Sequence, residues 1–199
     1  MEYYYSIEKS SIAEYKDRGS KFIGHAFPIQ NVTDFKLKLA AIKKEHSKAV
    51  HHCFAYRLGV AGDNFRVNDD GEPSGSAGKP ILGQIDSKSL VNVAIVVTRY
   101  FGGTLLGIPG LIQAYKTASA LSIQTTPIIQ YPILISYCAE FDYNIQNEVI
   151  RILKQSQCVI IETNINLFSS VIFGVPKNRE SEVAYKIQEI RNVMLKKIL

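Results

Sequence analysis

VVTRYFGGTLLGIPGLIQAY, residues 96–115, joins an apolar β-branched run to Arg99, a glycine-containing connection and a segment with helical character from Pro109. The apolar run, which begins at Val93, is typical of a buried strand. The connection contains Gly102, Gly103 and Gly107. Glycine permits positive φ and close approach, and proline is tolerated in the first turn of a helix. The stretch therefore predicts a strand, a tight turn and a helix.

Arg99 is the residue of this stretch that is the strongest candidate for binding a ligand. Arginine is rarely buried without a partner, so we expect its side chain to leave the core and meet water or an anion. Unpaired N–H groups at the start of the following helix favour an anion, and the rings of Tyr100 and Phe101 can stack on bases. The interpretation is a cradle for phosphate or nucleic acid; the alternative is a tight turn with a surface arginine.

The composition is that of an ordinary globular protein. The 199 residues are 46% hydrophobic and 21% charged, which allows one large domain or two small ones. An apolar run of membrane-spanning length is missing, and the first residues, MEYYYSIEKS, do not have the pattern of a signal peptide. We therefore expect a cytoplasmic protein with no membrane partner.

Charge and cysteine content narrow the function classes. The net charge is +5, with 15 basic and 11 acidic residues in 1–130 and 8 and 7 in 131–199. This surplus permits contact with the ribosome or RNA but does not require it. Cys53, Cys138 and Cys158 are far apart and lack metal-ligand spacing, so they are expected to be reduced. We expect no metal and no cofactor.

Two prolines, at positions 127 and 132, interrupt the pattern and predict a boundary between domains 1–128 and 129–199. In the first domain, periodicity predicts strands at 21–29, 52–59 and 92–98, a helix capped by Thr33, and a helix over 109–123. In the second it predicts strands at 132–139, 158–165, 168–175 and the C-terminal end, with helices capped by Asp142 and Asn178. This β-α-β-β-α-β order is ferredoxin-like.

DDGEPSGSAGKP, residues 69–80, is a long shaped loop and the second candidate site. Its candidate cleft residues are Asp69, Asp70, Glu72, Ser74 and Ser76, with His51 from outside the loop, whereas Lys79 is a candidate for binding nucleic acid or another anion together with Arg99. The acids suit Mg²⁺ or a general base, but adjacent acids in such a loop more often bond their own backbone. The serines are not in a nucleophile elbow, so we assign no catalytic residue, and an enzyme is the less favoured class.

Three motifs together resemble the YigZ/IMPACT family: RGSKFIGHAFP at 18–28, DDGEPSGSAGKPIL at 69–82 and VVTRYFGGTLLGIPGLIQAY at 96–115. The whole chain resembles the bacterial two-domain form. The resemblance implies an α+β protein whose N-terminal two-layer α/β domain is similar to the fourth domain of elongation factor G and to ribosomal-protein domains. It implies a ferredoxin-like C-terminal domain similar to that factor's fifth. Eukaryotic relatives act in translational control, and bacterial members are described as translation regulators or nucleic-acid binders.

The sequence departs from the family pattern RYFGGIKLGAGGLVRAY. Leu105 replaces a usual lysine, Pro109 a glycine and Gln113 an arginine, so two cations of the cradle are lost. We expect the turn to form with weaker phosphate affinity.

Three hypotheses follow. The first is a translation regulator that binds the ribosome or nucleic acid through the face of residues 69–80 and 99–110, with Arg99 on phosphate. The second is a protein that binds a phosphorylated or carboxylated metabolite and acts on it through Asp70 or Glu72. The third is an adaptor for a translation-associated protein. In that case the apolar rim would consist of Leu105, Leu106, Ile108 and Leu111.

Overall fold

The structure is a computed structural model that describes residues 1–198. The chain separates into two compact units, Tyr4–Tyr131 and a second made of Met1–Tyr3 with Pro132–Leu199. The predicted boundary after residue 128 falls inside strand β7 (Ile128–Pro132), which pairs with β1 (Tyr3–Ile7) in a two-stranded sheet. That 1–128 and 129–199 fold independently remains a prediction.

A five-stranded antiparallel sheet forms the centre of the N-terminal unit, in the order β2-β3-β6-β4-β5. Its strands are β2 (Ser11–Asp17), β3 (Ser20–Pro28), β4 (His51–Leu58), β5 (Asn64–Asn68) and β6 (Val93–Tyr100). Its helices are α1 (Val32–Glu45), α2 (Gly78–Ser87) and α3 (Gly107–Gln124). Strand β2 was not predicted from the sequence, because apolar Ile12 lies on its exposed side together with Glu14 and Lys16, so apolar and polar residues do not alternate along it.

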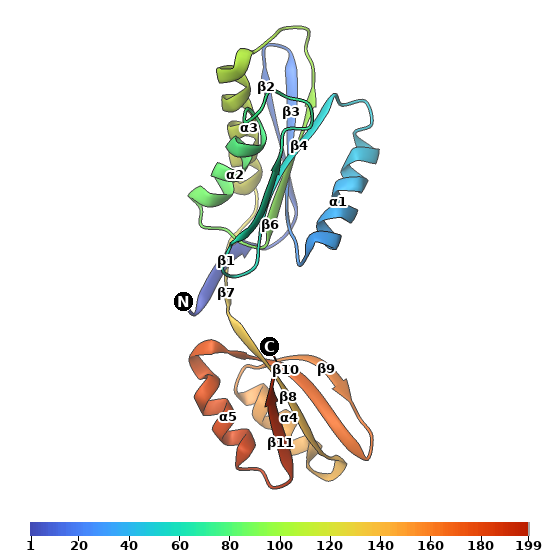
Figure 1. Ribbon diagram of the computed structural model, residues 1–199, viewed down its shortest axis with the longest axis vertical. Helices are drawn as coiled ribbons and strands as arrows, with labels where there is room; N and C mark the ends of the chain where they lie inside the picture. The colour runs from blue at the N-terminus through green and yellow to red at the C-terminus, as the bar shows by residue number, and fades with distance from the viewer. Residues whose placement is uncertain (199) are drawn as a thin grey trace. The chain divides into compact units, whose positions relative to one another are not determined.

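Helices cover both faces of this sheet, with α1 on one side and α2 and α3 on the other (Figure 1). The expected two-layer arrangement is therefore wrong in this detail, and the unit has three layers. The reason lies in β6, which is buried at seven consecutive positions. Its residues alternate between a core under α2 and α3, which includes Val97, and a core under α1, which includes Val96.

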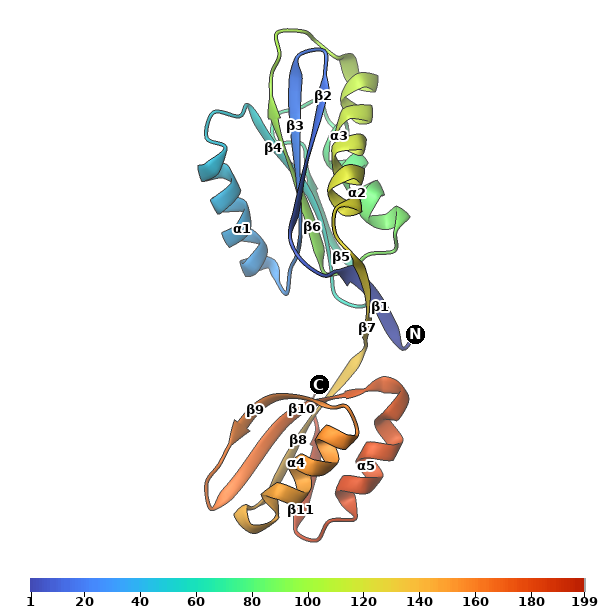
Figure 2. The same ribbon diagram turned by 180° about the vertical axis from the view of Figure 1, so that it is seen from behind.

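The C-terminal unit has the predicted β-α-β-β-α-β order, so the two-domain α+β class is confirmed. Its elements are β8 (Leu134–Asp142), α4 (Gln146–Gln155), β9 (Val159–Asn164), β10 (Phe168–Pro176), α5 (Glu180–Gln188) and β11 (Val193–Lys197). The sheet order is β11-β8-β10-β9, with every pair antiparallel. Both helices pack on one face (Figure 2) and bury an apolar core that includes Val149, Phe173 and Ile187.

The three predicted helix caps are wrong. The N-cap of α1 is Asn31, whose side chain accepts from the backbone N–H of Asp34, and Thr33 already lies within the helix. A 3₁₀ turn separates Asp142 from α4, and Asn178 itself lies in a 3₁₀ turn (Lys177–Arg179) before α5. Such tight turns are frequent at helix starts, and periodicity does not distinguish them from the helix.

No helix within residues 1–198 combines the length and apolar character needed to cross a membrane.

Candidate functional site

The carboxylate of Glu72 joins the loop 69–80 to strand β6 and helix α3, and so connects the second and third motifs. Its Oε1 atom lies 2.7 Å from Nη1 of Arg99 on β6 and accepts a hydrogen bond from the Tyr115 hydroxyl of α3, also at 2.7 Å. The Nε2 atom of His51 lies 3.9 Å from the same oxygen. Glu72, Arg99 and Tyr115 are all buried, so this polar cluster forms part of the core beneath the loop 69–80.

The expectation that Arg99 leaves the core is wrong. The residue is 6% exposed, and the anion that its guanidinium meets is the Glu72 carboxylate of the same chain. The guanidinium also lies near two aromatic rings, with its carbon 5.4 Å from the centroid of Phe22 and 5.6 Å from that of Phe101. Arg99 therefore has a structural role, because the Glu72 carboxylate already neutralises its charge and leaves little attraction for an external phosphate.

Cys53 belongs to the same cluster. Its sulfur lies 3.3 Å from the Tyr115 hydroxyl and 3.0 Å from the carbonyl oxygen of Asp69. Burial, above all, raises the pKa of the Cys53 thiol to about 12 and raises that of the Tyr115 phenol as well. Both groups are therefore protonated at neutral pH, and the thiolate that a nucleophile requires does not form there.

Asp69 organises the loop 69–80 from inside. Its carboxylate accepts hydrogen bonds from the backbone N–H groups of Gly75, Ala77 and Gly78, at 2.8–3.0 Å, where the loop enters α2. Burial raises the pKa of this carboxyl, but the three N–H donors and the charge of Lys79 outweigh it and hold the pKa below its usual range. Asp69 thus bonds its own loop, as expected for acids in a glycine- and proline-rich turn.

The other polar residues of this loop divide between the interior and the surface. Ser76 is fully buried and donates to the carbonyl of Pro73, whereas Ser74 and Lys79 are exposed. The Asp70 carboxylate accepts from the backbone N–H of His52. Among residues 1–198, no group of three or more His, Cys, Asp or Glu side chains is arranged to hold a metal ion.

The glycines after Arg99 serve the fold in two ways. A Cβ on Gly102 would lie 1.9 Å from the carbonyl carbon of Gly19, so the turn between β2 and β3 and the end of β6 meet backbone against backbone. Gly103 and Gly107 have φ of +84° and +69°, values that side-chain-bearing residues rarely adopt. The first and third motifs are therefore tied together by a glycine contact, and the second and third by Glu72.

The side chains left at the surface of the third motif are mainly apolar. Phe101 is 49% and Leu105 82% exposed, and Ile108 and Ile112 on the first turns of α3 are also exposed. We call these four residues the exposed apolar patch. The prediction that Leu106 and Leu111 belong to an apolar rim is wrong, because both are buried in the core. Tyr100 lies on the opposite face of the sheet, where its hydroxyl is 2.9 Å from Nδ1 of His46.

Residues 18–123, just over half of the chain, match the Impact N-terminal domain family. The chain belongs to the IMPACT family. It is similar to IMPACT family member YvyE of Bacillus subtilis, with 31% identity over 159 residues, which cover 80% of this chain and 73% of the relative. IMPACT family member YigZ of Escherichia coli is 29% identical over 172 residues, which cover 85% and 84%.

Eukaryotic IMPACT proteins share a shorter segment. Protein IMPACT of Rattus norvegicus is 34% identical over 95 residues. These residues cover 46% of this chain and 30% of the rat protein. Among solved structures, a crystal structure of a hypothetical protein matches 100% of this chain and 98% of its own, with a TM-score of 0.80 and 26% identity. The IMPACT family match thus contains all three motifs, while the structural match extends over both units.

Proposed function

We propose that this chain is a cytoplasmic regulator of translation that acts by binding a protein of the translation apparatus through the exposed apolar patch. Membership of the IMPACT family supports the connection with translation, because the family resemblance implies translational control by its eukaryotic members. The observation that carries the choice of a protein partner is the exposure of Phe101, Leu105, Ile108 and Ile112 on one connection and the helix that follows it. Large apolar side chains that remain exposed on one segment of a folded chain favour a protein-binding surface.

Nucleic acid is the weaker candidate for this surface. The charge of Arg99 is balanced by Glu72, and the family's lysine and arginine positions are occupied by Leu105 and Gln113. Affinity for a phosphate backbone grows with the number of free cations that contact it. A surface that exposes apolar side chains where cations are usual favours a protein.

Site-specific crosslinking on purified ribosomes, to which the full chain is bound, tests this proposal. A photoreactive phenylalanine analogue replaces Leu105 in one variant and Val60, an exposed apolar residue of the turn between β4 and β5, in the control. We expect position 105 to crosslink to a protein and position 60 not to. Leu105→Asp combined with Ile108→Asp should weaken co-sedimentation by roughly tenfold or more, because a charge in a desolvated contact is costly.

Nuclease treatment and salt separate the two kinds of partner. Binding to a protein should survive nuclease and change little between about 50 and 300 mM salt, whereas phosphate contacts weaken steeply over that range. Loss of the crosslink with nuclease, or equal crosslinking from positions 60 and 105, would contradict the proposal.

A further inference from the structure

The second face of the C-terminal sheet, opposite α4 and α5, carries an unusual mixture of side chains. Strand register places Met194, Glu140, Ser170 and Asn164 in one row across the sheet, and Lys196, Cys138, Ile172 and Glu162 in the next. Asp142 and Phe168 are paired at the end of the sheet beside the first row. Their neighbours along each strand, such as Phe141 and Val171, point the other way into the helix-covered core. We call these ten residues the open face.

Two of the three apolar residues of the open face, Phe168 and Met194, line a hollow. Phe168 is 85% exposed, Met194 is exposed and Ile172 is half-buried. A hollow of about 610 Å³ lies at this end of the sheet, and its lining includes Phe168, Met194 and Ser170. That volume is within the range of sites that hold a small molecule or a few side chains of a partner.

Acidic residues also lie on the open face, two of them at the hollow. Glu140 and Asp142 contribute to its lining, and Glu162 lies on the adjacent row. The one cation of the open face is Lys196, whose Nζ is 3.3 Å from both carboxylate oxygens of Glu140. Among residues 1–198, the Lys196–Glu140 pair is the one ion pair that involves the open face. Within this part of the chain neither Asp142 nor Glu162 forms an ion pair, so their negative charges are not neutralised by a neighbouring basic side chain.

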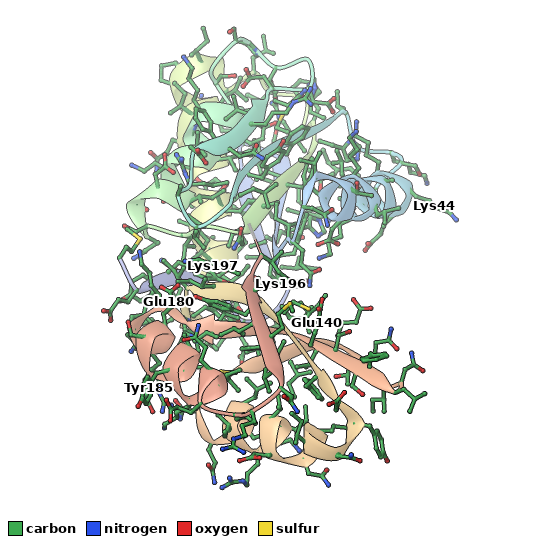
Figure 3. The ribbon with its side chains drawn as sticks, turned by 60° about the horizontal axis from the view of Figure 1, so that its bottom comes forward. Lys44, Glu140, Glu180, Tyr185, Lys196 and Lys197 are labelled. Atoms are coloured by element: carbon green, nitrogen blue, oxygen red, sulfur yellow. The ribbon has the colours of Figure 1, made fainter. Side chains whose placement is uncertain are left out.

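A second lysine next in sequence does not change this balance. Lys197 lies on the opposite side of β11 (Figure 3), where its Nζ is 2.6 Å from Oε1 of Glu180. The Tyr137 hydroxyl donates to the same oxygen, and strand register pairs Tyr137 with Lys197. The side chain of Lys197 therefore lies on the helix-covered side of the sheet and not on the open face. The open face therefore has three carboxylates against one ammonium group, although the whole chain carries a net charge of +5.

We propose that the open face binds an extended peptide segment of a partner protein that combines apolar and basic side chains. Its apolar side chains would contact Phe168 and Met194 at the hollow, and its lysines or arginines would face Asp142, Glu162 and Glu140. Charge complementarity selects this partner, because the field of the carboxylates attracts cations and repels phosphate. RNA is disfavoured as a ligand of this face by the same charges.

Fluorescence anisotropy with the full chain tests the proposal. The probe is a labelled synthetic peptide of alternating lysine and leucine, compared with its glutamate–leucine counterpart and with a single-stranded oligouridine. We expect binding of the lysine–leucine peptide alone, and weaker binding as salt is raised. Phe168→Ala, and Asp142→Asn combined with Glu162→Gln, should each lower affinity by roughly tenfold, as expected for truncation of a central contact.

Matched controls come from the helix side of the same unit. Tyr185→Ala removes an exposed aromatic side chain from α5, and Glu148→Gln removes an exposed charge from α4. Neither should change the affinity for the peptide. The proposal is overturned if the peptide does not bind, if the controls weaken it as much as the open-face variants, or if oligouridine binds and Phe168→Ala abolishes that binding.

Discussion

Replacement of Glu72 by alanine is the most direct test of the role assigned to the motif residues. The change leaves Arg99, a residue that is 6% exposed, without its carboxylate partner, and it removes the acceptor of the Tyr115 hydroxyl. Breaking a buried ion pair by removing one partner typically costs about 3–5 kcal/mol. We therefore expect the free energy of unfolding of the N-terminal unit to fall by about 4 kcal/mol, a large share of the 5–15 kcal/mol typical of a domain.

The assay is urea unfolding of the full chain at pH 7, with amide hydrogen exchange in β6 and α3 to isolate the N-terminal unit. Arg99→Met and the double variant complete a cycle. Because the double variant buries no unpaired charge, it should be more stable than the sum of the single effects by about 2 kcal/mol or more. Glu14→Gln is the control, since Glu14 pairs with Lys16 and Lys21 at the surface, and its unfolding curve should match the wild type.

Two results would refute the reasoning about the cluster. One is a cost below about 1 kcal/mol for Glu72→Ala, which is the scale of an exposed ion pair. The other is an additive cycle, which would mean that the carboxylate and the guanidinium do not depend on each other.

Three further changes test other parts of the structure. Gly102→Ala forces a methyl group to within 1.9 Å of the carbonyl carbon of Gly19 and should destabilise the N-terminal unit by about 3 kcal/mol or more, measured by urea unfolding; an unchanged midpoint would contradict the contact. Burial first, and then the neighbouring charge of His46, lower the pKa of His25 from 6.5 to about 4. Because the unfolded chain binds this proton at a higher pH than the folded chain, the free energy of unfolding should fall by at most about 3 kcal/mol as the pH drops from about 6.5 to 4. The substitution His25→Gln should remove this part of the pH dependence when unfolding is measured across that pH range. Residues 132–199 expressed alone should give a dispersed amide spectrum and a cooperative melt, and a spectrum without dispersion would show that they are not an independent domain.

Periodicity along the chain was enough to predict the order of most elements. In the C-terminal unit, short apolar runs bounded by polar turns led to β-α-β-β-α-β, because each strand and helix buries one face and repeats with its own period. The same argument recovered β3, β4, β6 and α3 to within a few residues. It missed β1, β2 and β7, and it placed the helix caps wrongly, since these depend on pairing partners and on local 3₁₀ turns that leave no periodic signal.

The sequence by itself determined which residues matter, whereas the tertiary structure decided what they do. The motifs selected Glu72, Arg99 and the glycines, and an acid and a base in separate motifs were compatible with either an internal pair or two ligand contacts. Strand alternation places Arg99 on the same face as Val97, and the loop 69–80 folds over that face, so the two charges meet 27 residues apart in a site closed to solvent. Which charges neutralise each other, and which apolar side chains remain exposed, depends on distances between segments remote in sequence, and those distances exist only once the sheet and its helices have packed.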